Sequence, residues 1–314
     1  MLELPSYPSP IGKDYTRYYS AIEAFNRQLQ ERVRAALMYA IEETATQLAI
    51  LTTGSDGRFE KGPKSLLEVT VICENQQLVR DEIKKLREVV GSNYRESIFE
   101  PSLDVKSLAT DIFSYFNNDP SRVYPCRVID GRLLYGRLSL FLLGKAKIIY
   151  EVKGKEGKYI IKKVKDRKRI AKQVTTTGMG RFKGERTYFD LETGEAYYDE
   201  DEYLLSFKVG PLRYVQTWLL KELLNYIRAR SFNYGNQLLL DTPSKIPSKI
   251  HFFNYEGVIN KTADERRIII DHYLYFLWLY HISQYNSLKL GNPITEFDSK
   301  EVKKRLTDLV ELIG

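Results

Sequence analysis

The stretch LAILTTGSDGRFEKGPKSLLEVTVI, residues 48–72, has two hydrophobic runs separated by a short polar segment. Each run has the length and apolar composition of a buried strand, and Gly54-Ser55 lies where a turn is expected. Backbone N–H groups and the Ser55 hydroxyl of such a turn can donate to phosphate oxygens, and Gly54 permits close approach. Arg58 adds a bidentate guanidinium. The stretch predicts a strand, a phosphate-binding turn and a strand, although it also fits a plain turn with a surface arginine.

Hydrophobic patterns on either side of this stretch predict further elements. Apolar residues at steps of three and four indicate an amphipathic helix over residues 19–43. A second helix is predicted over 79–90, with Gly91 as its natural end. Residues 122–129 predict a third strand, and 133–152 fit either a helix or a strand. The N-terminal part of the chain is therefore expected to combine a sheet with helices.

The rest of the chain changes from strand-like to helical patterns. Turn residues divide 154–207 into short strands and hairpins. Helices are then predicted over residues 212–230, 263–285 and 299–313. Asp298 is the expected N-cap of the last helix. The fold class is therefore α+β, with one domain over residues 1–210 and a helical domain over 211–314.

The net charge is moderately positive and unevenly distributed. With 48 Lys and Arg against 41 Asp and Glu, the charge of +7 permits anionic partners without requiring them. Residues 153–172 hold ten basic and two acidic side chains, whereas 185–202 hold eight acidic side chains and one basic. Because these charges nearly cancel, a solvated basic segment facing an acidic hairpin is preferred to a nucleic-acid-binding stripe, which remains an alternative.

Cysteine use and hydropathy indicate a cytoplasmic protein. Cys73 and Cys126 each lie in a hydrophobic run, which favours buried thiols in a reducing compartment over a disulfide framework or a zinc site. No secretory signal is recognisable at the N-terminus. The most apolar helical segment, residues 268–282, is too short to cross a bilayer and contains Asp271 and two histidines.

Three segments together resemble a known family. The pattern G-S-x-G-R-x-x-x-G-P-x-S-x-x-E, from Gly54 to Glu68, resembles the active-site segment of the nucleotidyltransferase superfamily. IDGRLLYGRLSLF, residues 129–141, is similar to the third-carboxylate segment of the bacterial signal-protein uridylyltransferases. FKVGPLRYVQTWLL, residues 207–220, resembles a Lys-x-Gly-Pro segment of those enzymes and of the glutamine-synthetase adenylyltransferases. The three segments follow the family's order over about residues 48–218.

The resemblance implies a nucleotidyltransferase-type mixed sheet with flanking helices, and a nucleoside triphosphate bound at the turn. The residues implied in nucleotide binding are Gly54, Ser55, Arg58, Lys208 and Arg213. Glu68 and Asp130 are implied as the catalytic, metal-binding carboxylates for Mg²⁺. In this chemistry two metal ions bridge the triphosphate and activate the acceptor oxygen, so the family uses a cluster of carboxylates.

The sequence departs from the family at the first metal carboxylate. Leu66 stands where the family has an aspartate, two residues before Glu68, and a leucine cannot bind Mg²⁺. Asp56 and Glu60 are nearby acids, but neither lies on the strand of Glu68. Losing a ligand removes a large electrostatic contribution to catalysis. We therefore expect a nucleotide-binding or regulatory pseudo-enzyme with a protein partner, ahead of an active enzyme that transfers a nucleoside monophosphate to a protein or small molecule.

The downstream hydrolase domain of the uridylyltransferases is not expected in this chain. That domain needs a His…His-Asp…Asp metal set, whereas this chain has only His251, His272 and His281. His272 and His281 are nine residues apart on one predicted helix, so they point to opposite sides and cannot share a metal ion there. We interpret them as structural histidines among aromatic neighbours.

Overall fold

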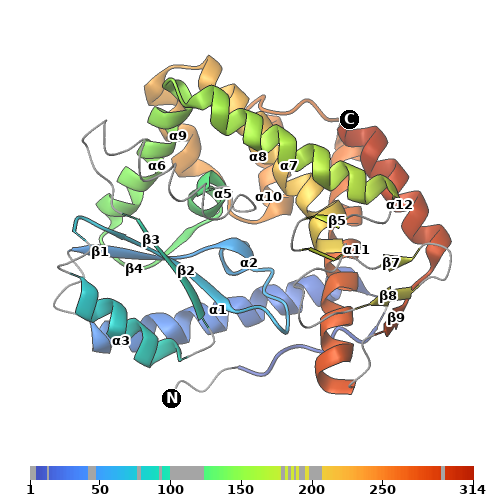
Figure 1. The fold of residues 1–314 in the computed structure, drawn as a ribbon, viewed down its shortest axis with the longest axis horizontal. Coiled ribbons are helices and arrows are strands. Elements are labelled where there is room, and N and C mark those ends of the chain that lie inside the picture. The colour runs from blue at the N-terminus through green and yellow to red at the C-terminus, as the bar shows by residue number, and fades with distance from the viewer. Residues whose placement is uncertain are drawn as a thin grey trace.

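The two hydrophobic runs around Gly54 form neighbouring antiparallel strands, as the sequence predicts. In the computed structural model these are β1 (Leu48–Thr52) and β2 (Leu67–Cys73). Strand β4 (Arg132–Gly136) pairs antiparallel with the other edge of β1, and β3 (Tyr94–Phe99) pairs in parallel with β2. The sheet order is therefore β3-β2-β1-β4, with three antiparallel strands and one parallel edge strand (Figure 1).

All structural statements concern the residues that the structure describes. These are residues 5–12, 14–41, 47–75, 79–91, 94–99, 124–177, 181–182, 185–186, 189–190, 195–197, 207–290 and 294–314. They form a mostly helical α+β fold with this small sheet near the N-terminus and a helical C-terminal half.

One face of the sheet is covered by the two helices that the N-terminal pattern predicts. Successive residues of a strand point to opposite faces, so Leu48 and Ile50 lie together on this side. They pack with α1 (Tyr15–Ala40) and α3 (Arg80–Val90) in one hydrophobic cluster. Gly91 ends α3 with a φ of 71°, a conformation that favours glycine. Both predicted helices are confirmed.

The opposite face of the sheet is also covered by helices. Ala49 and Leu51 belong to a second hydrophobic cluster with residues of α5 (Tyr124–Ile129) and α6 (Leu138–Lys153). The predicted third strand over 122–129 is therefore wrong, because α5 occupies its described part. The edge strand β4 begins after Asp130-Gly131 instead. The ambiguous segment that follows is divided between β4 and α6.

The basic segment is helical, which corrects the expectation of strands throughout 154–207. Helix α7 (Gly157–Thr177) buries an apolar face whose period is that of a helix. The buried residues of that face are Ile160, Ile161, Val164, Ala171 and Val174. Described strands here are short: β5 (Arg181–Phe182), β6 (Glu185–Arg186), β7 (Phe189–Asp190) and β8 (Glu195–Tyr197). The side chains of the acidic hairpin lie outside the described residues.

The C-terminal half confirms the three predicted helices and adds others. Its elements are η2 (Lys208–Leu212), α8 (Arg213–Ala229), α9 (Phe232–Asp241), α10 (Ile246–Tyr255), α11 (Ala263–Tyr285), η3 (Asn286–Leu290), β9 (Ile294–Glu296) and α12 (Ser299–Ile313). Asp298 caps α12 as expected. Within the described residues, no helix combines the length and hydrophobicity that crossing a bilayer requires.

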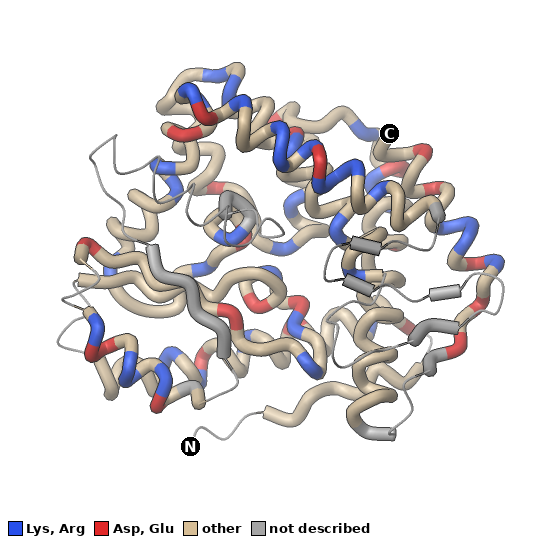
Figure 2. Tube along the Cα trace, in the orientation of Figure 1, with Lys and Arg blue, Asp and Glu red and all other residues tan. Residues whose placement is uncertain are grey.

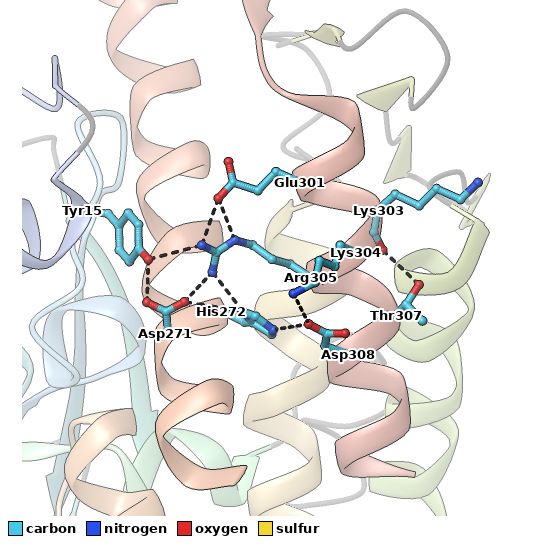
Figure 3. Close-up of polar contacts among 9 residues, drawn as sticks. All are labelled: Tyr15, Asp271, His272, Glu301, Lys303, Lys304, Arg305, Thr307 and Asp308. Carbon is cyan, nitrogen blue, oxygen red and sulfur yellow. Dashed lines mark hydrogen bonds and ion pairs between the residues drawn. The ribbon is translucent and has the colours of Figure 1, made fainter. Parts of the chain in front are cut away.

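A hydrogen-bonded arginine joins α12 to α11 and α1 (Figure 3). Arg305 donates to Asp271 at 2.5 Å and to Glu301 at 2.9 Å, and also to the Tyr15 hydroxyl at 3.3 Å. The Tyr15 hydroxyl in turn donates to Asp271 at 2.5 Å. These contacts fix the first turn of α1 against the C-terminal helices.

The histidines of α11 are structural, in agreement with the sequence interpretation. Arg305 lies 2.9 Å from Nδ1 of His272, and a guanidinium only donates, so this nitrogen must be the acceptor. Nε2 then bears the proton and donates to Asp308 at 3.2 Å. His281 is fully buried, and burial lowers its pKa to about 3. Its Nδ1 lies 3.0 Å from the hydroxyl of Tyr18.

Candidate functional site

The turn between β1 and β2 is one short helical turn, α2 (Gly54–Gly57). Gly54 has a φ of +58°, and a Cβ added there would lie 1.6 Å from Oε2 of Glu68. A Cβ on Gly57 would lie 2.3 Å from the backbone oxygen of Asp130. Both predicted carboxylate residues therefore touch this turn, Glu68 at its first residue and Asp130 at its last. Conformation favours glycine at Gly54, and close approach of the Asp130 backbone requires it at Gly57.

Asp56 lies inside the turn and holds it against β2. Its carboxylate is fully buried and accepts a hydrogen bond from the backbone N–H of Glu68 at 2.9 Å. Lys61 lies 3.5 Å from the other carboxylate oxygen, and Gln30 of α1 donates to the Asp56 carbonyl at 2.7 Å. Burial raises the pKa of Asp56 to about 6, against the opposing effect of Lys61. The residue supports the turn from within, and Lys61 already balances its charge.

Arg58 is paired with carboxylates of the protein and does not extend into solvent. Its Nε donates to Glu60 at 2.7 Å and its NH1 donates to Asp130 at 3.0 Å. The Glu60 side chain is 1% exposed and accepts a further hydrogen bond from the Tyr273 hydroxyl at 2.9 Å. Burial raises the pKa of Glu60, and Arg58 opposes that rise.

Asp130 is held between two cations. One carboxylate oxygen accepts from Arg58, and the other is in direct contact with the ammonium of Lys249, from α10. The side chains of Lys249 and Asp130 are 4% and 9% exposed. A third cation, Lys145 of α6, has its pKa lowered to about 8 by burial and then by the charge of Lys249. The Asp130 charge is therefore already neutralised within the protein.

The predicted magnesium site does not fit these contacts. A bound Mg²⁺ needs oxygen ligands that face it in octahedral geometry. Both oxygens of Asp130 face protein cations, Leu66 offers no ligand, and Glu68 alone remains beside Gly54. Among the described side chains, no three of the His, Cys, Asp and Glu residues gather where they could hold a metal ion. Metal binding would require Arg58 and Lys249 to leave Asp130.

The other residues implied in nucleotide binding lie at different places. Ser55 is the second residue of α2 and is partly exposed, and its carbonyl accepts from the Glu60 N–H at 2.7 Å. Lys208 begins η2 and lies 5.5 Å from the ring centroid of Tyr280 on α11. Arg213 begins α8, and its carbonyl accepts a hydrogen bond from Thr217. The structure thus brings Arg58 to Asp130 and Gly54 to Glu68, whereas Lys208 and Arg213 lie in the helical half.

Sequence reasoning missed Lys249 and Tyr273, which complete the polar cluster. Lys249 is 119 positions from Asp130, and Tyr273 is 213 positions from Glu60. Each lies in a helix whose pattern indicates only burial. The strongest available indication was the lysine itself, because a lysine on the apolar side of a helix needs a partner.

Comparisons with known proteins give no family for this chain. No family model matches the sequence, and the search of curated proteins gives no match. The resemblance therefore depends on the three segments quoted above and on the strand, turn and strand that contain the first of them.

Proposed function

We propose that the protein is a nucleotide-binding module of the nucleotidyltransferase type that regulates or recruits a protein partner and has lost metal-dependent catalysis. The observation behind this proposal is the occupation of both Asp130 oxygens by Arg58 and Lys249. A carboxylate paired in this way cannot supply the charge that two-metal transfer requires. The glycine turn that would bind phosphates keeps its strand-to-strand setting.

The glycine turn supports nucleotide binding without supplying a reaction. Gly54 allows the backbone to approach Glu68 closely, and the partly exposed Ser55 places a hydroxyl on the turn. Hydrogen bonds from such groups to phosphate oxygens are charge-assisted and correspondingly strong. A regulatory role would use binding alone, since a ligand stabilises whichever state of the protein it prefers.

A thermal-shift series with the four nucleoside triphosphates, each with and without Mg²⁺, tests binding. At 100 times its Kd a ligand stabilises the native state by about 2.7 kcal/mol, so a rise in Tm of about 5 °C is expected. The rise should not need Mg²⁺. Ser55→Glu should abolish it by placing a negative charge on the turn. Ser20→Glu is the matched control, because Ser20 is exposed on α1. If none of the nucleotides raises Tm, the nucleotide-binding proposal is wrong.

A label-transfer assay separates the module from an active enzyme. With an α-labelled triphosphate, Mg²⁺ and candidate protein or small-molecule acceptors, no transfer is expected. Transfer that depends on Mg²⁺ and disappears in Glu68→Gln and Asp130→Asn would establish the alternative, an active nucleotidyltransferase. In that case Arg58 and Lys249 would have to release Asp130 when the substrate binds.

The second alternative, nucleic-acid binding, is supported by the surface of α7. Lys158, Lys162, Lys165 and Arg169 are exposed at steps of three and four along one side of this helix. Figure 2 shows basic residues along its length. Polyanion binding by this stripe would weaken steeply with salt, as counterion release requires. An affinity for single- or double-stranded nucleic acid that does not change between low and high salt would exclude this alternative.

A further inference from the structure

Two arginines stack on one aromatic ring immediately after the turn. The guanidinium carbon of Arg27, from α1, lies 4.8 Å from the centroid of the Phe59 ring, and that of Arg132, from β4, lies 4.3 Å from it. Phe59 is buried and has a φ of 60°, which is uncommon for a residue with a side chain. Such strain is retained where the surroundings hold the residue in place. The ring is therefore a fixed support for two like charges.

These arginines belong to a small cluster with more cations than carboxylates. We call Arg27, Arg132, Lys245 and the acid Glu23 the Phe59 cluster. Glu23 accepts from Arg27 at 2.6 Å and from Lys245 at 2.9 Å. Arg132 donates to the Ser244 hydroxyl at 3.2 Å and, among the described residues, makes no ion pair. Three cations therefore share one carboxylate, and the cluster has a net charge of +2.

Arg132 is the cation whose charge is least compensated. Burial, and after it the neighbouring charge of Arg27, lower the pKa of Arg132, while Glu23 raises it. A partly buried guanidinium beside another guanidinium is unfavourable unless an anion lies nearby. Its planar donor groups match the oxygens of a phosphate in a bidentate arrangement. The missing negative charge at this position is the strongest indication of a ligand.

The surroundings of the cluster also favour an anion. Lys245 is the N-cap residue of α10, and its side chain makes no capping hydrogen bond. The N-terminus of a helix carries partial positive charge, which adds to that of the three cations. The cluster also adjoins the glycine turn, because Phe59 follows Arg58 directly and Gln30, one turn after Arg27 on α1, donates to the Asp56 carbonyl. A ligand with several phosphates could contact both places.

We infer that the Phe59 cluster binds a phosphate group, with Arg132 as its principal ligand and Arg27 and Lys245 beside it. The chemical class is a phosphate ester or free phosphate, bound through protein cations in place of a metal ion. That the phosphate belongs to a nucleotide rests on the proposed function. The half-exposed Arg27 and the partly exposed Lys245, with side chains 49% and 26% exposed, place the cluster within reach of solvent.

The test measures binding of three probes, inorganic phosphate, tripolyphosphate and ATP, by calorimetry in a low-salt, phosphate-free buffer without Mg²⁺. Arg132→Gln should weaken binding about tenfold or more, since a hydrogen bond to a charged group is worth that much. Arg132→Lys should weaken binding less, because a lysine keeps the positive charge but lacks the bidentate donor arrangement of a guanidinium. Arg27→Gln repeats the test at a more exposed position, in case Arg132→Gln does not fold. Lys158→Gln on α7 removes one charge elsewhere and is the control.

The outcomes distinguish the two proposals. Binding of phosphate and ATP that Arg132→Gln or Arg27→Gln weakens, and that Lys158→Gln does not, supports the site. Binding of phosphate or tripolyphosphate in the same pattern, without any nucleotide binding, supports the site and contradicts the nucleotide proposal. Nucleotide binding that neither arginine variant changes overturns the site and leaves the proposed function intact. Equal weakening by Lys158→Gln, or no binding of any probe, also overturns the site.

Discussion

Replacing Asp56 with asparagine is expected to stabilise the protein at neutral pH. Burial raises the pKa of Asp56 to about 6, from an ordinary value of about 3.9. This difference of about 2 pH units corresponds to about 3 kcal/mol that the ionised, buried carboxylate costs the folded state. This pKa already includes the attraction of Lys61, at 3.5 Å, but the amide nitrogen of an asparagine would lie where Oδ1 has no hydrogen-bond partner, which should offset about 1 kcal/mol of the gain. Asp56→Asn should therefore raise the free energy of unfolding by about 2 kcal/mol at pH 7.5.

The sign of the pH dependence follows from proton binding. Between about pH 4 and pH 6 the folded state holds a proton on Asp56 that the unfolded chain has released. The contribution of Asp56 to stability is therefore largest below pH 4 and decreases as pH rises toward 6. His281, whose pKa is lowered to about 3, opposes this trend, because the unfolded chain binds its proton more readily. Both proteins contain His281, so its effect cancels in the difference between wild type and variant.

The assay is urea unfolding at pH 4.5, 6 and 7.5, followed by tryptophan fluorescence. The stability difference between Asp56→Asn and wild type should increase with pH across this range. Asp81→Asn is the matched control, because Asp81 forms an exposed pair with Lys84, and its effect should stay within about 0.5 kcal/mol. A variant that is less stable than wild type at pH 7.5, by an amount that does not change with pH, would refute the argument.

Three further sets of substitutions test the contacts around the turn and the C-terminal helices. Gly57→Ala should lower the free energy of unfolding by about 3 kcal/mol, because its Cβ meets the Asp130 backbone. In Gly54→Ala the added Cβ meets only a movable side chain, so the loss should be about 1–2 kcal/mol. Equal losses for the two variants in urea unfolding would contradict this geometry. Lys249→Met should lower the free energy of unfolding by about 3 kcal/mol, because it leaves Asp130 with one cation. Adding Asp130→Asn should recover at least about 1 kcal/mol. A double mutant whose loss of stability is the sum of the two single losses would exclude the pairing. Arg305→Met should lower the free energy of unfolding by about 2 kcal/mol, since the partners of Arg305 are partly exposed. The pKa of His272 is lowered first by burial and second by the charge of Arg305, so the variant should raise it. An unchanged NMR titration of His272 would refute that contact.

Local patterns in the sequence were sufficient for the elements whose periodicity is clear. Continuous apolar runs predict the strands on either side of Gly54, and steps of three and four predict the helix α1. The same reasoning failed at α7, where Ile160 and Ile161 favour a strand locally although the longer pattern is helical. It failed again at α5, whose six residues are too few to show a period.

The sequence predicts the turn of the candidate site, but not the distant residues that pair with its side chains. Residue type and spacing single out Gly54 and Arg58, whereas their role in nucleotide binding is implied only by the resemblance; the structure places Gly54 first in α2 and Arg58 directly after it. Whether Arg58 could face a ligand depends on Glu60 and Asp130, and their pairing depends on how distant helices pack. Lys249 has no local sequence feature that relates it to Asp130, because the contact joins positions 119 residues apart. Contacts of this kind require the fold.

The link between Asp130 and Lys249 also bears on the predicted division of the chain at residue 210. Asp130 belongs to the sheet-containing half and Lys249 to the helical half, and Glu60 and Tyr273 form a second buried link between the same halves. A fragment of residues 1–210 would keep these two acids and lose Lys249 and Tyr273, so each acid would lose a buried partner. We therefore expect the two halves to fold as one cooperative unit. A ligand that moves the turn would then also displace α10 and α11, through the contacts of Asp130 with Lys249 and of Glu60 with Tyr273.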